Sequence, residues 1–204
     1  AQHGLVSQDR LGAQVAPSDV AGRVQGHAGL GLLDETGSHL DAHLVLVDLS
    51  CPESDVVSTR PREGNAVVST WAREQHAQIA INANFFDSSV CGLAVGDGRV
   101  WRDSYGPYCS SVMAFGPVGV GWRARVFDNH GITRESPVEW ATQMVSGMPI
   151  MLRDGQTYFD PNEPTGMYRT HPRTALGLSA DCSTFIILVA DGRAPADQRA
   201  EQAL

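Results

Sequence analysis

Side chains suited to binding an anion and moving a proton lie in two short blocks near the end of the chain. The first block, H-P-R-T-A-L-G, holds His171 and Arg173, and the second, D-G-R, holds Asp191 and Arg193. A guanidinium binds two phosphate oxygens at once, a carboxylate acts as a base or nucleophile, and histidine titrates near neutral pH. The blocks suggest chemistry at a phosphate-bearing substrate. A solvated arginine and a plain turn after an apolar strand are the simpler interpretations.

Two asparagines lie where an apolar segment ends, in I-N-A-N-F-F-D at residues 81–87. Strands disfavour asparagine, yet Asn82 and Asn84 both stand at the end of this one. A carboxamide both donates and accepts hydrogen bonds, as recognition of sugar hydroxyls requires. The block predicts a sugar-binding strand end. The alternative is that both amides satisfy the backbone of a turn.

A further candidate contact lies in the segment S-G-M-P-I-M-L, where Ser146 precedes Gly147. Because glycine has no side chain, a ligand can approach the backbone closely at this position. A turn that leads into the next hairpin explains the same residues equally well.

Most segments that position these residues have the pattern of strands. Asp-Gly between apolar runs predicts hairpins at Asp97-Gly98, within 93–101, and at Asp154-Gly155. Further strands are predicted at 43–49, 55–58, 78–83, 111–115, 119–127, 174–178 and 184–190, with helices at 65–76 and 138–143, a helical turn at 19–24 and the start of a helix at 194–204. We expect an α+β fold with a strand-rich mixed sheet, hairpins and a few packed helices. It forms a single domain over 43–204, after an N-terminal lead-in over 1–42.

Composition excludes several classes of partner. The chain has 204 residues, 42% hydrophobic and 19% charged, which suits a globular domain rather than a disordered one. Its formal net charge is -8, and all fifteen basic residues are arginines without basic runs, so nucleic acid and anionic membrane surfaces are not expected partners. No apolar stretch is long enough to predict a membrane span.

The cysteines indicate an oxidising compartment. None of the four belongs to a C-x-x-C pair, so two disulfides are favoured over a metal knuckle. Cys91 and Cys109 flank a segment rich in glycine and aromatic residues and are expected to pair, which leaves Cys51 with Cys182; free thiols are the alternative. The start Ala1-Gln2-His3 is typical of a protein whose signal peptide has been removed, so a secreted, extracellular or periplasmic location is expected.

In their order and spacing, these blocks resemble the phosphodiester glycosidase family. The family's N-G-G-F-F corresponds to residues 82–86, its R-T-A-x-G strand to 173–177, its D-G-R turn to 191–193 and an upstream V-D-L strand to 47–49. The resemblance covers about residues 43–193, and Asn84 stands where the family has a glycine. It implies a secreted hydrolase that releases a sugar from a sugar-1-phosphodiester.

The resemblance also implies roles for the candidate residues. Arg173 or Arg193 would stabilise the departing phosphate, and Asp191 would act as base or nucleophile, with His171 as the alternative. The sugar or phosphate would be bound by Asn82, Asn84, Ser146, Gly147, Thr174 and Arg193.

Family members continue past the D-G-R turn into a G-M-T-L-type helix and a D-G-G-G-S turn that is thought to complete the site. We therefore expect a companion C-terminal fragment of the same precursor. The alternatives are a truncated chain and a shortened relative that binds without catalysis.

Two other functions fit the same residues. One is a secreted glycan-binding or envelope-associated module without turnover, and the other is a phosphodiesterase that cuts the P–O bond. No catalytic cofactor or metal is expected. Asp87, Asp97 and Asp103 are candidates for a structural calcium site.

Overall fold

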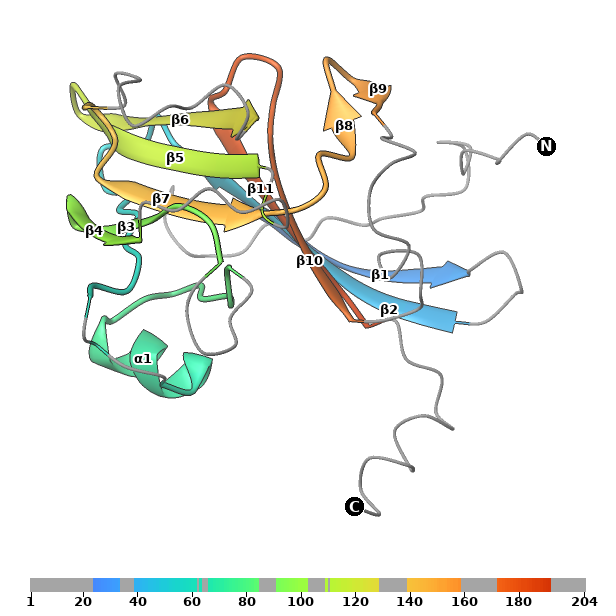
Figure 1. Ribbon diagram of the computed structural model, residues 1–204. Helices are drawn as coiled ribbons and strands as arrows, with labels where there is room; N and C mark the ends of the chain where they lie inside the picture. Colours follow the sequence, from blue (N-terminus) through green and yellow to red (C-terminus); the bar gives the residue numbers. More distant parts are fainter. Residues whose placement is uncertain are drawn as a thin grey trace.

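The computed structural model describes residues 24–33, 39–61, 63, 66–84, 91–102, 109, 111–128, 139–158 and 172–191. Within these residues the chain forms eleven strands and one helix (Figure 1). The fold is therefore mostly β, and the expectation of a few packed helices is wrong. The expected mixed sheet is also corrected, because all the strand pairings of the described part are antiparallel.

One sheet has four strands in the order β1-β2-β11-β10. Its strands are β1 (Val24–Leu33), β2 (His39–Asp48), β10 (Arg173–Leu178) and β11 (Thr184–Ala190). The central strand β11 carries the apolar run F-I-I-L-V-A, in which Phe185 and Ile187 are buried and Val189 is exposed. The four strands cross behind the second sheet and extend beyond it (Figure 1).

The second sheet has five strands in the order β4-β3-β7-β5-β6. They are β3 (Ala94–Gly96), β4 (Arg99–Arg102), β5 (Ser111–Val118), β6 (Gly121–Asp128) and β7 (Gln143–Gly147), while β8 (Leu152–Arg153) and β9 (Gln156–Thr157) form a separate hairpin. Both Asp-Gly turns are confirmed. Each has positive φ at both residues, 54° and 69° at Asp97-Gly98 and 53° and 74° at Asp154-Gly155, which is the conformation a two-residue hairpin loop requires.

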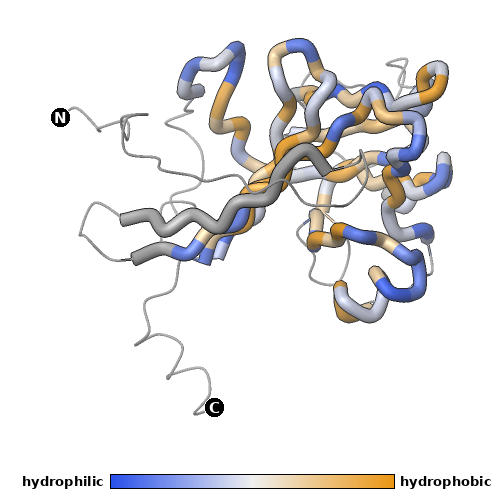
Figure 2. Tube along the Cα trace, turned by 180° about the vertical axis from the view of Figure 1, so that it is seen from behind, coloured by the Kyte–Doolittle hydropathy of each residue, from blue (hydrophilic) through white to orange (hydrophobic). Residues whose placement is uncertain are grey.

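The main core lies between the two sheets. It includes Phe115 from β5 and Phe185 and Ile187 from β11, and the two phenylalanine rings meet edge to face with centroids 5.0 Å apart. A second cluster, with Val112 and Ala114, lies on the opposite face of the five-stranded sheet, because successive residues of β5 point to opposite sides. Figure 2 shows the apolar residues concentrated along the crossing strands and the hydrophilic ones in turns.

Helix α1 (Val68–Glu74) lies to one side of the sheets (Figure 1). It has seven residues and is shorter than the predicted 65–76, and none of its residues is fully buried. Trp71 is half-buried and turns toward the space between the helix and the sheets. Among the described residues, no helix is long and apolar enough to cross a membrane.

Several predicted elements differ from the structure. The segments 55–58 and 78–83 form no strand, and the chain bends at Gln78 and Ile79, while Val56, Ile79 and Ile81 contact the core through their side chains. The predicted helix at 138–143 is wrong in its described part, since Glu139 and Trp140 form a turn and Gln143 already begins β7.

The N-terminal lead-in contributes to the sheet. Residues 24–33 form the edge strand β1, which pairs with β2 along its length, and β2 itself begins at His39, before the expected domain start at 43. Alternating glycines within β1 concealed this strand in the sequence pattern. The predicted turn at 19–24, except Val24, and the helix start at 194–204 lie outside the described residues.

Candidate active site

Asn84 connects the segment after α1 to the five-stranded sheet. Its side-chain Nδ2 donates to the carbonyls of Cys91 and Leu93 at 2.8 and 3.3 Å, and its Oδ1 accepts from the backbone N–H of Ser146 at 3.2 Å. The amide thus uses both of its N–H groups on backbone carbonyls. Asn84 fits the turn-satisfying alternative, because these hydrogen bonds all join its side chain to the backbone.

The backbone of Asn84 has a φ of 41°. This left-handed region is occupied readily by glycine and, among other residues, most often by asparagine and aspartate. The glycine-to-asparagine departure from the family pattern therefore keeps the backbone conformation accessible, and the carboxamide adds the contacts to Cys91, Leu93 and Ser146.

Ser146 is buried and its hydroxyl donates to the carbonyl of Leu93 at 2.7 Å. The Cys91–Cys109 disulfide is confirmed and lies beside it, with Cα atoms 6.2 Å apart. Gly92 has a φ of 72°, and a Cβ there would lie 2.6 Å from the Cβ of Ser146, so this packing requires glycine. Ser146 therefore belongs to the structural support of the site.

Gly147, the next residue, is open above its Cα, since an added Cβ would meet no atom within 4 Å. Its carbonyl accepts a hydrogen bond from the hydroxyl of Ser111 at 2.9 Å. Open space therefore adjoins Gly147, and its contact with a ligand stays a prediction.

Asn82 and Thr174 meet at the edge strand β10. The Thr174 hydroxyl donates to Oδ1 of Asn82 at 3.4 Å, across 92 residues of sequence. Asn82 is exposed and lines a cavity, and Thr174 shares its face of the sheet with the core residues Leu176 and Leu178. Among the described residues, this contact joins two predicted substrate-binding side chains and remains open to solvent.

Arg173 lies on the other face of β10, because side chains alternate along a strand. It is exposed, and its Nη1 donates to the carbonyl of Pro172 at 3.4 Å. The structure thus places Arg173 next to Thr174 in the chain but not on the same face. Since β10 is an edge strand, a long guanidinium side chain can still reach around that edge.

Asp191 follows β11 at the same end of the sheet. Arg173 pairs with Ala190 in the β10–β11 register, and the backbone N–H of Asp191 donates to the carbonyl of Asp41 at 2.8 Å. Asp191 is exposed. The structure therefore brings Arg173, Thr174 and Asp191 to one end of the four-stranded sheet, while His171 and Arg193 lie outside the described residues.

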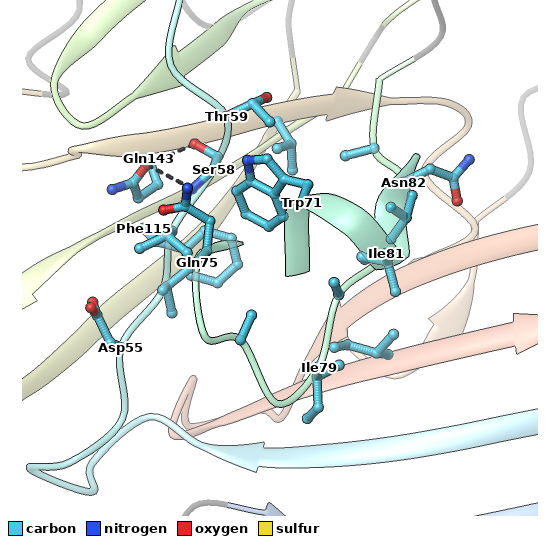
Figure 3. A pocket seen from close by; sticks show the side chains of 18 of the residues that line it. Asp55, Ser58, Thr59, Trp71, Gln75, Ile79, Ile81, Asn82, Phe115 and Gln143 are labelled. Atoms are coloured by element: carbon cyan, nitrogen blue, oxygen red, sulfur yellow. Dashed lines mark hydrogen bonds between the residues drawn. The ribbon is translucent and has the colours of Figure 1, made fainter. Parts of the chain in front are cut away.

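A cavity of about 760 Å³ extends from Asn82 beneath helix α1 (Figure 3). Its walls come from α1, the segment 75–84, the segment 54–59 and the facing strands of both sheets. The sequence carries no local signal for this cavity, because its lining residues belong to segments whose patterns separately predict a helix, two strands and a turn.

Gln143 supports one side of the cavity. It is buried, and its Oε1 accepts hydrogen bonds from the hydroxyl of Ser58 at 2.7 Å, from the Ser58 N–H at 3.1 Å and from the Asp97 N–H at 3.1 Å (Figure 3). One side chain therefore ties the segment 54–59 and the β3–β4 turn to β7. A lone glutamine before an apolar run gave no signal for this role.

The second predicted disulfide is corrected. Cys51 is half-buried and Cys182 is exposed, and both are free thiols. Cys182 lies in the tight β10–β11 turn with a φ of 59°, where its N–H donates to the carbonyl of Ser179. Elimination suggested this pair, but adjacency of β2 and β11 alone does not bring the sulfur atoms together.

Metal ligands were also considered. Within the described ranges, no group of three or more histidine, cysteine, aspartate or glutamate side chains has the proximity to hold a metal ion. Asp97 forms an ion pair with Nε of Arg60 at 3.2 Å, and Asp87 and Asp103 lie outside these ranges.

Comparison with known proteins identifies the class. The sheet end and its neighbouring cavity belong to a glycosidase-type enzyme domain, since a family model described as phosphodiester glycosidase matches residues 75–203, more than half of the chain. The chain belongs to the phosphodiester glycosidase family. The match includes both asparagines and the strands β3 to β11, whereas β1, β2 and α1 precede it. No curated protein matches the chain significantly.

Proposed function

We propose that the protein is a secreted hydrolase that releases a sugar from a sugar-1-phosphodiester. The contact between Asn82 and Thr174 carries this proposal, because it lies inside the matched region, remains open to solvent and adjoins the sheet end that holds Arg173 and Asp191. Two hydroxyl- and amide-bearing side chains at one edge suit a sugar ring or its N-acetyl group.

In the proposed reaction, water adds to the anomeric carbon and the bond from this carbon to the phosphate oxygen breaks. The phosphate monoester leaves with the electron pair and is already acidic, so a protonating acid contributes less than in ordinary glycosidases. Arg173, or Arg193, stabilises the charge that develops on the leaving group. Asp191 accepts the proton of the water, or it attacks the anomeric carbon itself and forms a glycosyl ester that water then hydrolyses, with His171 as the alternative base.

Arg173→Ala tests this assignment. Loss of a guanidinium that stabilises developing charge is expected to lower kcat/KM for a sugar-1-phosphodiester about 100- to 1,000-fold. Arg173→Lys should restore part of the loss, because the charge returns without the two-pronged geometry. Arg125→Ala, at an exposed arginine of β6, is the matched control. Unchanged turnover in Arg173→Ala would remove this residue from the mechanism.

The proposal also includes a location for the protein and a protein partner. The Cys91–Cys109 disulfide supports an oxidising, extracellular or periplasmic location. A companion C-terminal fragment of the same precursor is the proposed protein partner, and the segment 78–83, which pairs with none of the described strands, offers it backbone hydrogen-bonding groups. An intact mass equal to this chain alone, in a sample that hydrolyses the substrate, would exclude the companion.

A glycan-binding module without turnover is the alternative function. The same exposed Asn82 and Thr174 would bind the sugar, and the sheet end would hold the phosphate without catalysis. Saturable binding of a sugar-1-phosphodiester that is recovered uncleaved after long incubation would favour this alternative.

A further inference from the structure

The cavity beneath α1 is partly open to solvent, since several of the residues that line it are exposed. Protein interiors are close-packed and contain few voids larger than a water molecule, whereas small-molecule sites measure about 300 to 1,000 Å³. At about 760 Å³ the cavity falls within the range of a ligand site. Its lining includes the exposed Asn82, one of the two side chains proposed to hold the sugar.

The inner wall of the cavity is apolar. It is formed by Ile79 and Ile81 on one side and by strand residues of both sheets on the other, among them Phe115, Phe185 and Ile187. Two polar groups on this wall are already engaged, since the Ser58 hydroxyl donates to Oε1 of Gln143. A sugar would lose its hydrogen bonds to water without replacing them there.

Two tryptophans form part of the wall nearer the surface. The indole N–H of Trp101 donates to the carbonyl of Thr59 at 2.7 Å, and that of Trp71 donates to a carboxylate oxygen of Glu63 at 3.4 Å. With both donors satisfied, the rings contribute apolar surface to the cavity. Gln75 caps the C-terminal end of α1 through its backbone N–H, which donates to the carbonyl of Trp71 at 2.9 Å, and its side chain lies beside Trp71 over the cavity (Figure 3).

Charge is nearly absent from the described lining. Asp55 and His76 are its titratable residues, both are exposed, and no arginine is among them. A phosphate would therefore remain outside the cavity, toward the sheet end that carries Arg173. An occupant with an apolar body inside and a phosphate outside fits both regions.

We propose that the cavity binds the apolar aglycone of the substrate, so that the substrate class is a sugar-1-phosphodiester of an alkyl, acyl or isoprenoid alcohol. This inference rests on the proposed function, because the sugar and phosphate take the places assigned above. Hydrolysis then releases the sugar at Asn82 and leaves an alkyl phosphate, whose chain occupies the cavity.

Binding of monoalkyl phosphates tests the cavity without requiring turnover. The probes are ethyl, butyl, hexyl and octyl phosphate below micelle-forming concentrations, and affinity is measured on the full chain by tryptophan fluorescence and calorimetry. Complete burial of each methylene is expected to lower Kd about fourfold. A Kd that does not depend on chain length would overturn the proposal, including the case in which a companion polypeptide already fills the cavity.

A matched pair of variants locates the binding. Ala80→Phe places a ring in the cavity, whereas Ala180→Phe adds the same ring in the exposed β10–β11 turn. We expect Ala80→Phe to weaken octyl phosphate binding at least tenfold and leave ethyl phosphate binding unchanged, with no effect of Ala180→Phe. If Ala80→Phe fails to fold, Ala77→Leu is a smaller change in the same wall. It should likewise weaken octyl phosphate binding and leave ethyl phosphate binding unchanged. Octyl phosphate binding that survives in folded cavity variants would contradict the assignment.

Binding and turnover measurements together distinguish a failure of the cavity proposal from a failure of the proposed function. Chain-length-dependent binding without hydrolysis of any sugar-1-phosphodiester would leave the cavity assigned and defeat the proposed function. Equal kcat/KM for methyl and octyl aglycones would keep the proposed function and defeat the cavity assignment.

Discussion

At Asn84, a single side chain joins three parts of the chain through the carbonyls of Cys91 and Leu93 and the N–H of Ser146. It does so from a left-handed backbone that glycine would also accept. The residue that departs from the family pattern therefore keeps the backbone conformation and supplies additional hydrogen bonds. We infer that its contribution is to stability and to the placement of Asn82.

Two substitutions separate these contributions. Asn84→Gly removes the hydrogen bonds and retains the backbone conformation, so we expect the free energy of unfolding to fall by about 1 to 3 kcal/mol. Asn84→Ala also adds strain at positive φ, so its free energy of unfolding should fall by about 1 kcal/mol more than that of the glycine variant. Urea denaturation measures both. Equal stability of the glycine variant and the parent would show that the hydrogen bonds contribute nothing.

Asp181 is the residue whose protonation most clearly affects a turn. Hydrogen bonds from the Ser179 hydroxyl, then from the Ser183 N–H and hydroxyl, lower the pKa of its carboxyl group from 3.8 to about 2. Because the folded-state pKa lies below the unfolded value, the stabilisation is present above about pH 4 and is lost as the pH falls through about 2.

Asp181→Asn should therefore be less stable than the parent at pH 6, with a difference that shrinks below pH 4. Thermal unfolding of both proteins across this pH range measures the effect, and Asp154→Asn in the β8–β9 turn is the control. A difference in stability that is the same at pH 2 and pH 6 would contradict the assignment of the effect to the carboxylate.

Among the elements, the hairpins were predictable because their signal is local. Asp97-Gly98 and Asp154-Gly155 each contain the residues that accept positive φ, so neighbouring residues determine the turn. The segment 78–83 has the apolar pattern of a strand, but strand formation needs a partner, and Ile79 and Ile81 pack on the core without one. Strand pairing depends on distant residues and is not contained in a local pattern.

Some residues of the candidate site were also predictable from the local sequence, whereas others depend on contacts between distant segments. Sequence patterns identified Asn82 and Thr174, which the fold brings together across 92 residues. They did not reveal that Ser146 and Asn84 bind each other, or that Gln143 closes the side of a cavity, since both depend on contacts between distant segments. The Cys51–Cys182 pair was inferred by elimination, which takes no account of side-chain direction.

The disulfide between Cys91 and Cys109 fixes the loop that supports Asn84 and Ser146. The loop spans 18 residues, and opening one of this length is expected to lower the free energy of unfolding by about 3 kcal/mol. Denaturation with and without reductant measures the loss. Thiol titration is the control, with two reactive groups expected in the unreduced, unfolded protein and four after reduction. Four groups before reduction would contradict this disulfide.

At the scale of the molecule, two antiparallel sheets enclose a core and leave a cavity between their faces and the segment that carries α1. The end of the four-stranded sheet presents Arg173 and Asp191, and its edge presents Thr174 beside Asn82. Membership of the phosphodiester glycosidase family and this arrangement lead to the same account, in which the sugar lies at the edge and the phosphate at the sheet end.

The bond that is cleaved tests this account most directly. The protein is incubated with a sugar-1-phosphodiester in water enriched in heavy oxygen, and both products are analysed by mass spectrometry. The account predicts label on the anomeric hydroxyl of the released sugar and none in the phosphate monoester, because water adds to the anomeric carbon. Label in the phosphate product would show cleavage of the P–O bond and contradict the assignment as a glycosidase.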